Sequence, residues 1–239
     1  MNVALVTGAN KGIGRAIAER LLREGYALGF AAHSQDEQTA EELRTLGDLH
    51  HVWGDLEDPQ VPPRLVDEVA AHFGRLDVLV NNAGITTSKP ALELTVEDFD
   101  KTIHVDLRAT FLASQAAARA MNDGGVIVNI TSVHEHVPRP GFLIYAAAKA
   151  GLGMLTRGLA LELAPEIRVV AVAPGAIATE RNREARELFP EIPLGRPGRP
   201  EEIAAAVAWL CSDECPYITG ASIVIDGGMA QQVVEHPAG

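Results

Sequence analysis

The chain has 239 residues, of which 47% are hydrophobic and 22% are charged, and its formal net charge is -12. This composition can fill a large core and lacks the low hydrophobicity of disordered chains. The negative charge argues against nucleic acid or an anionic membrane as a partner, because both repel an acidic surface. We therefore expect a globular protein whose partner is a small molecule.

The cysteines and the first residues indicate the cellular compartment in which the protein is expected. Cys211 and Cys215 are the only cysteines, and we expect two reduced thiols rather than a disulfide or a metal site. The chain starts with a strand-like run, without a basic region or a cleavage site. No stretch approaches the roughly 18 to 20 apolar residues of a membrane span. The expectation is a cytoplasmic protein that holds no metal.

Short apolar runs alternate with helical periods along the chain, which is typical of parallel strands joined by crossover helices. Several runs are apolar on both faces, as buried parallel strands are. The pattern predicts one α/β domain over residues 1–239, a doubly wound parallel sheet of seven strands with helices on both faces. The expected strands are Val3–Thr7, Ala27–Ala31, His51–Trp53, Leu76–Val80, Val126–Ile130, Val169–Val172 and Ser222–Ile225. The expected helices are Ile13–Glu24, Glu37–Leu46, Pro63–Phe73, Val96–Met121, Tyr145–Leu163 and Glu201–Cys211.

The stretch Gly175–Pro200 is rich in proline, glycine and charge. A loop of this length inside a compact domain often closes over a ligand. We expect a substrate loop here, with a short helical patch at Arg183–Phe189 as a small lid; a plain surface excursion is the alternative.

The first strand is followed by Thr7-Gly-Ala-Asn-Lys-Gly-Ile-Gly14 and then by a helical run. Glycines let the backbone approach a pyrophosphate, and the N–H groups at a helix N-terminus carry the positive end of its dipole. This order of strand, glycine turn and helix predicts a dinucleotide site.

The spacing T-G-x-x-x-G-x-G resembles that of the short-chain dehydrogenase/reductase family. Other motifs follow in that family's order and cover essentially the whole chain. They are Asp55-Leu56, Asn81-Asn-Ala-Gly84, Ser132, Tyr145-Ala-Ala-Ala-Lys149, Pro174-Gly-Ala-Ile-Ala-Thr179 and Asp226-Gly-Gly228. The resemblance implies a Rossmann-like fold and an NAD(P)(H)-dependent oxidoreductase that interconverts a carbonyl and a secondary alcohol.

By the same resemblance, Asp55 and Leu56 contact the adenine, and Asn81 and Gly84 flank the cofactor. Asn-Asn-Ala-Gly is also a good turn, and an aspartate can simply cap the segment after it. Ile177 and Thr179 would meet the nicotinamide carboxamide. The full expected cofactor site is Thr7, Gly8, Lys11, Gly12, Ile13, Gly14, His33, Ser34, Asp55, Leu56, Asn81, Ala83, Gly84, Tyr145, Lys149, Pro174, Gly175, Ile177 and Thr179.

Tyr145 and Lys149 are the candidate catalytic pair. They lie four residues apart, so both face the same side of a helix one turn apart. The positive charge of Lys149 favours the phenolate, which suits Tyr145 to exchange a proton with the substrate oxygen. In the family the lysine also holds the nicotinamide ribose. Ser132 matches the family's serine, which polarises the substrate oxygen through a hydrogen bond.

Asp106 departs from the family pattern, which has asparagine at this position. A carboxylate only accepts hydrogen bonds, whereas an amide also donates. In the family this residue holds a water linked to the lysine, partly through its main-chain carbonyl, and Asp106 can support the same relay. Alternatively, it pairs with Lys149 and partly cancels its charge. We predict an active enzyme, in the second case with an alkaline-shifted pH profile.

The residues that end the second predicted strand bear on the choice of cofactor. NAD-preferring members place an acidic residue there, whereas this chain has Ala32-His33-Ser34. These small polar groups and Lys11 suit a 2′-phosphate, and we expect NADP(H) rather than NAD(H). Asp36 is the alternative ribose ligand.

Two subfamilies compete for the substrate. The length, the glycine loop and residues 32–34 resemble 3-oxoacyl-(acyl-carrier-protein) reductases of fatty acid biosynthesis, our first expectation. The segment from Ser132 to Pro138, with His134 and His136, is similar to glucose 1-dehydrogenases, which act on sugars. The carrier-protein reductases dock their acidic partner through arginines, but the matching positions here are Val126 and Glu166, although Arg139, Arg181 or Arg183 can substitute. We expect both histidines to be polar pocket or surface groups rather than metal ligands.

Two further expectations rest on the resemblance. The family commonly forms homotetramers through the helices predicted at Val96–Met121 and Tyr145–Leu163 and through the last strand. The main rival class is a non-catalytic dinucleotide-binding sensor, which only Asp106 favours.

Overall fold

The computed structural model describes residues 1–122, 124–180 and 192–231. In this part of the chain seven parallel strands form one sheet in the order β3-β2-β1-β4-β5-β6-β7. The strand order reverses between β1 and β4, as in doubly wound sheets. The predicted α/β fold, a seven-stranded Rossmann-like sheet, is confirmed.

The strands are β1 Val3–Thr7, β2 Ala27–Ala32, β3 Leu49–Trp53, β4 Val78–Asn81, β5 Gly125–Ile130, β6 Ile167–Pro174 and β7 Ser222–Ile225. The helices are α1 Gly12–Arg23, α2 Glu37–Arg44, α3 Val61–Phe73, α4 Val96–Ile103, α5 Ala109–Ala120, α6 Leu143–Glu162 and α7 Pro200–Cys211. Short turns are η1 Ala91–Glu93, η2 His104–Arg108, η3 Val133–Glu135 and η6 Met229–Gln231. No helix in the described ranges has the length and apolar content that a membrane crossing needs.

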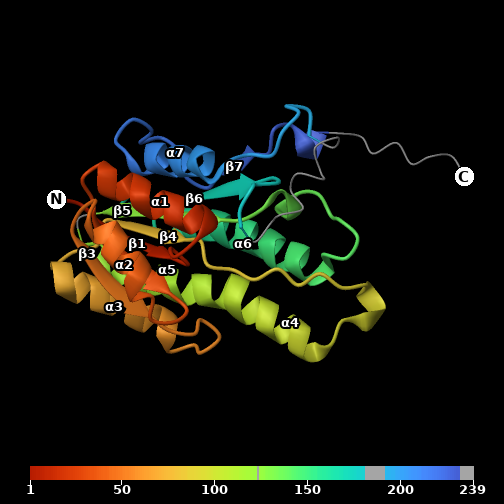
Figure 1. The fold of residues 1–239 in the computed structure, drawn as a ribbon, viewed down its shortest axis with the longest axis horizontal. Helices are drawn as coiled ribbons and strands as arrows, with labels where there is room; N and C mark the ends of the chain where they lie inside the picture. Colours follow the sequence, from red (N-terminus) through yellow and green to blue (C-terminus); the bar gives the residue numbers. More distant parts are fainter. Residues whose placement is uncertain (123, 181–191, 232–239) are drawn as a thin grey trace, which may run out of the picture.

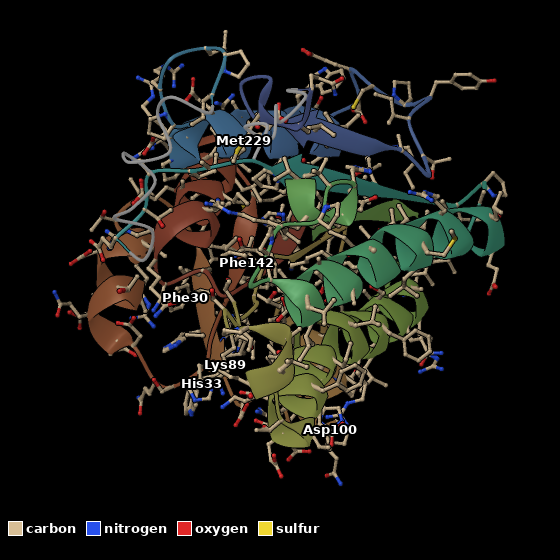
Figure 2. All side chains as sticks on the ribbon, turned by 90° about the vertical axis from the view of Figure 1, so that its right-hand side faces the viewer. Phe30, His33, Lys89, Asp100, Phe142 and Met229 are labelled. Atoms are coloured by element: carbon tan, nitrogen blue, oxygen red, sulfur yellow. The ribbon has the colours of Figure 1, made fainter. Side chains whose placement is uncertain are left out.

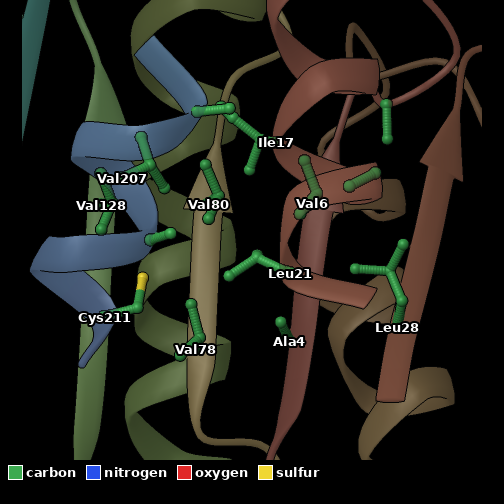
Figure 3. Close-up of a cluster of buried hydrophobic side chains, with 14 of the residues drawn as sticks. Ala4, Val6, Ile17, Leu21, Leu28, Val78, Val80, Val128, Val207 and Cys211 are labelled. Carbon is green, nitrogen blue, oxygen red and sulfur yellow. The ribbon is translucent and has the colours of Figure 1, made fainter. Parts of the chain in front are cut away.

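The sheet lies between two helical layers. Figure 1 shows α1 and α7 on one side of it and α3 and α5 on the other. In the first layer, Ile17 and Leu21 of α1 and Val207 of α7 cover the valines of β1, β4 and β5, as Figure 3 shows. Both faces of the central strands are therefore buried, which explains their continuous apolar sequence.

The two cysteines belong to this layer. Cys211 and Cys215 are buried and free, as expected. Burial raises the pKa of the Cys211 thiol to about 12. Cys211 is therefore a core residue rather than a reactive group.

The helix predicted at Val96–Met121 is interrupted. It consists of α4, one π-helical turn at His104–Arg108, and α5. The N–H of Ala109 bonds to the carbonyl of His104, five residues back. The segments before and after the turn each have a helical pattern, so the sequence predicted one continuous helix.

Several other boundaries differ from prediction, among them the start of the third strand at Leu49 rather than His51. The fourth strand begins at Val78 rather than Leu76, because its pairing with β1 starts where Ala4 faces Val78. The sixth strand extends from Ile167 to Pro174, because its ends pair with Gly125 of β5 and Ile225 of β7. The predicted patch Arg183–Phe189 lies outside the described residues.

We predict that Gly29→Ala lowers the free energy of unfolding by about 1–3 kcal/mol, because its methyl group overfills the core. A Cβ atom at Gly29 would lie 2.6 Å from Cγ2 of Val69. Gly158→Ala in α6 is the control: its Cβ meets no atom within 4 Å, and the better helix former should add about 0.5–1 kcal/mol. Denaturant unfolding measures both, and equal stabilities would contradict the prediction.

Candidate active site

A cleft of about 1030 Å³ opens at the carboxyl ends of the strands. Its walls come from residues at or just after the ends of β1 to β6, the usual place for a ligand in such sheets. Figure 2 looks onto this side of the molecule and labels His33, Phe142 and Met229, which line the cleft.

The glycine loop is shaped for close approach of a ligand. Gly8 and Gly12 have φ angles of 63° and 55°, in the left-handed region that favours glycine. A Cβ at Gly14 would lie 2.2 Å from the carbonyl oxygen of Gly8, so only glycine lets α1 start directly against the loop. Lys11, the N-cap residue of α1, makes no capping hydrogen bond with its side chain. The end of α1 therefore offers its N–H groups to an anion, which fits a dinucleotide pyrophosphate.

Asn82, not Asn81, reaches this loop. The amide nitrogen of Asn82 donates to the carbonyl oxygens of Thr7 (2.9 Å) and Gly8 (3.1 Å). The side chain of Asn81 is buried and donates to Oδ1 of Asn129 at 2.9 Å, inside the protein. The expectation that Asn81 flanks the cofactor is therefore corrected for its side chain. Successive residues of a strand face opposite sides, and this alternation could have separated the two asparagines.

The structure brings most expected cofactor residues to the cleft. Of the predicted set, Asn81 and Ser34 do not line it. Asp55 lines it, but its Oδ1 also accepts the N–H of Glu57 at 2.9 Å, so the alternative role as a local cap holds too. The lining positions are Thr7, Gly8, Lys11, Gly12, Ile13, Gly14, His33, Asp55, Leu56, Ala83, Gly84, Tyr145, Lys149, Pro174, Gly175, Ile177 and Thr179. The cleft is also lined by residues outside the expected cofactor set, among them Asn10, Asn82, Ile85, Thr131, Arg139, Phe142 and Met229.

The four residues expected to be catalytic, including Asp106, line the same cleft. Ser132 follows β5 and caps η3, where its Oγ accepts the N–H of His134 at 3.2 Å. Tyr145 and Lys149 lie in the first turns of α6, and Nζ of Lys149 is 5.6 Å from the centroid of the Tyr145 ring. Lys149 is only 4% exposed and donates to the carbonyl oxygen of Ile130 at 3.2 Å. The ammonium group is thus fixed close to the phenol.

Asp106 faces this lysine from the π-helical turn. Its side chain is fully buried, and its Oδ2 lies 3.3 Å from Nζ of Lys149. Its Oδ1 accepts the N–H of Ile85 at 2.8 Å, which fixes the carboxylate. Of the two sequence interpretations, the structure shows the ion pair. A buried carboxylate this close offsets part of the charge by which Lys149 favours a phenolate.

His134 forms part of the wall next to Tyr145. Its ring stacks on Phe142 with centroids 5.3 Å apart and meets Tyr145 edge-on at 6.0 Å. Burial lowers the pKa of His134, so the imidazole is neutral at pH 7. Its Nδ1 lies 3.0 Å from the carbonyl oxygen of Val137 and donates to it, which leaves Nε2 as an acceptor. His136 does not line the cleft, and the described residues contain no cluster suited to a metal.

Comparison with known proteins gives the family. A family model described as enoyl-(acyl carrier protein) reductase matches residues 8–230. The chain is 43% identical to the uncharacterized oxidoreductase YohF of Escherichia coli over 95% of its length and 94% of that protein. It is 41% identical to glucose 1-dehydrogenase 2 of Bacillus subtilis, covering 95% and 93%. It is 40% identical to a 3-oxoacyl-[acyl-carrier-protein] reductase of Staphylococcus aureus, covering 95% and 97%.

Solved structures of similar proteins indicate the same family. An acetoin dehydrogenase from Enterobacter cloacae is 43% identical with a TM-score of 0.91, covering 99% of this chain and 98% of that one. A blue fluorescent protein from a metagenomic library, solved in complex with NADPH, is 37% identical with a TM-score of 0.91, covering 96% and 98%. The chain therefore belongs to the short-chain dehydrogenase/reductase family. It is an oxidoreductase that acts on CH–OH groups with a nicotinamide dinucleotide.

We predict that Asp106→Asn moves the kcat/KM profile by about one unit towards lower pH, because the neutral amide leaves the charge of Lys149 uncompensated. The amide oxygen of Asn can keep the hydrogen bond from Ile85. The control is Asp55→Asn, which removes a carboxylate on the adenine side of the cleft and should leave the profile in place. An identical pH dependence in Asp106→Asn and the unmodified enzyme would exclude the effect.

Proposed function

We propose that this oxidoreductase is an NADP(H)-dependent ketoreductase in which Tyr145 is the proton donor. The observation that carries the proposal is the fixed position of the Lys149 ammonium group beside the Tyr145 ring, in a cleft shared with the glycine loop. The bound dinucleotide supplies the hydride for reduction or takes it up in oxidation. Tyr145 gives its phenolic proton to the substrate oxygen, or receives that proton when an alcohol is oxidised.

Two further side chains complete the proposed chemistry. Ser132 donates its hydroxyl hydrogen to the substrate oxygen and so polarises the carbonyl, because its Oγ already accepts a backbone N–H and is held in place. Lys149 holds the ribose and stabilises negative charge on Tyr145.

The adenine end of the cleft supports the choice of NADP(H). His33 and Lys11 line the cleft where a 2′-phosphate would lie, after β2 and in the glycine loop. Asp36, the alternative ribose ligand, accepts the N–H of Thr39 at 3.2 Å as the N-cap of α2 and is not part of the cleft wall. Its carboxylate already has a structural role.

We predict that kcat/KM with NADPH exceeds that with NADH by about tenfold or more, as expected for one or two charge-assisted hydrogen bonds to a phosphate. His33→Asp should reverse the preference, because the new carboxylate repels the 2′-phosphate and accepts from ribose hydroxyls. Initial rates at equal cofactor concentrations measure both, with Asp36→Asn as the control that should keep the preference. Equal rates with NADH and NADPH would contradict it.

Within this class, we propose 3-oxoacyl thioesters as the substrates to test first. The similarity to a 3-oxoacyl-[acyl-carrier-protein] reductase supports this choice. In the cleft wall, the guanidinium carbon of Arg139 lies 5.7 Å from the centroid of the Phe142 ring. No ion pair joins Arg139 to a carboxylate of the described residues, so it is suited to an anionic carrier group. Arg181 and Arg183 lie outside the described residues.

Sugars and vicinal hydroxy ketones are the second candidate. Similarity to a glucose 1-dehydrogenase and an acetoin dehydrogenase supports it. The Nε2 acceptor of His134 beside Tyr145 suits a hydroxyl group next to the reacting carbon.

The substrate panel should compare acetoacetyl-coenzyme A, acetoin and, in the oxidative direction, glucose. We predict the highest kcat/KM for the thioester. In Arg139→Gln the KM for the thioester should increase about tenfold, as expected for one charge-assisted contact, and the KM for acetoin should not change.

Tyr145→Phe should reduce turnover of every substrate by about 100-fold or more while NADPH affinity stays nearly unchanged. Higher efficiency with glucose or acetoin would favour the second candidate, and normal turnover in Tyr145→Phe would overturn the proposed role of the tyrosine.

We also propose the homotetramer that the family resemblance implies. Large apolar side chains on the outer faces of α4, α5 and α6 support it, because apolar residues gathered on a surface often mark an interface. They are Phe99, Phe111, Met154 and Leu161.

A further inference from the structure

Glu135 is a charged residue buried beside the catalytic residues. It ends η3, three residues after Ser132, and its side chain is only 1% exposed. Its Oε2 accepts the hydroxyl hydrogen of Ser222 at 2.8 Å, and its Oε1 accepts from Nη2 of Arg157 at 3.3 Å. Nε2 of His136 lies 3.7 Å from Oε1. The carboxylate thus has partners on β7, on α6 and on its own turn.

A glycine makes room for this carboxylate. A Cβ atom at Gly153 would lie 2.1 Å from Oε1 and 2.4 Å from Cδ of Glu135. The side chain therefore crosses α6 where the helix carries no side chain of its own. Gly153 lies one turn after Lys149 and two turns after Tyr145, so the crossing point is close to the catalytic part of the helix.

We propose that Glu135 is a positioning residue that fixes Ser132 relative to Tyr145. Ser132 is the N-cap of η3, whereas Tyr145 is carried by α6. The Glu135 carboxylate connects these two elements and anchors both to β7, which is paired with β6 in the sheet. This inference rests on the proposed function, because it assigns Ser132 and Tyr145 to the same substrate oxygen.

The energetics favour a specific role over simple packing. Burying a carboxylate costs several kcal/mol unless hydrogen bonds and a counter-charge compensate it. An apolar side chain could fill the same space without that cost, but it would not accept two directed hydrogen bonds from two elements. Directed bonds hold donors and acceptors within a few tenths of an ångström, and a misplacement of 1 Å can reduce a rate about 100-fold.

The test compares Glu135→Ala, Glu135→Gln and Ser222→Ala, with Glu162→Ala at the exposed end of α6 as the matched control. We expect Glu135→Ala to lower kcat about 10- to 100-fold while the Kd for NADPH remains unchanged, because the partners of Glu135 lie on β7, on α6 and next to η3 rather than in the glycine loop. Glu135→Gln keeps an acceptor for Ser222 and should recover most of kcat. Ser222→Ala should lower kcat about two- to tenfold, the effect of one hydrogen bond, and Glu162→Ala should have no effect.

Hydrogen exchange of the purified proteins gives a readout independent of turnover. In Glu135→Ala, amide exchange should accelerate in residues 132–137 and at the start of α6, and not in residues 7–14. If the unmodified enzyme reduces carbonyl compounds and Glu135→Ala keeps its kcat, the positioning role is overturned and the proposed function stands. If the unmodified enzyme reduces no carbonyl compound, the proposed function fails, and the exchange data alone decide whether Glu135 holds the turn. Equal loss of kcat in Glu135→Gln and Glu135→Ala would also overturn the inference. It would show that a side chain of the same shape, with an oxygen that accepts the Ser222 hydrogen bond, does not restore kcat.

Discussion

The buried ammonium group of Lys149 is the constraint on which the active site depends. It is almost inaccessible to water, so it must be compensated by protein groups. The carbonyl oxygen of Ile130 and the carboxylate of Asp106 lie within 3.3 Å of it. These partners belong to β5 and to the π-helical turn, so one charge holds three elements around the cleft. The same ammonium group lies 5.6 Å from the centroid of the Tyr145 ring, so the charge that holds these elements together also faces the phenol.

Asp106 changes the balance of this arrangement. An asparagine at this position would leave the positive charge of Lys149 uncompensated. The carboxylate of Asp106 offsets part of that charge. The π-helical turn places Asp106 opposite Lys149, because the extra residue in the turn alters the direction of the side chains that follow it. Thus a local backbone irregularity decides how strongly the catalytic pair is polarised.

Two buried carboxylates contact α6 about one turn apart. Asp106 contacts it through Lys149, and Glu135 crosses it at Gly153 and contacts Arg157. In both cases a charged group is buried next to the catalytic part of the helix and is compensated by directed bonds. Such pairs contribute more to a defined geometry than to net stability. The glycine-loop side of the cleft relies instead on backbone groups and on the amide of Asn82.

The sequence by itself determined the α/β class, the number of strands, the glycine loop, and Ser132, Tyr145 and Lys149 as members of one site. The fold class, the glycine loop and the Tyr145–Lys149 pair depend on local periodicity and short spacings, since four residues on a helix or a glycine turn after a strand have the same geometry in any fold. Ser132 was identified through the family resemblance. The tertiary structure decided that Asn82 rather than Asn81 reaches the loop, that Asp106 pairs with Lys149, and that Glu135 joins η3, α6 and β7. These contacts span 22 to 87 residues of sequence. Their existence depends on how the strands and helices pack, and no local pattern encodes that.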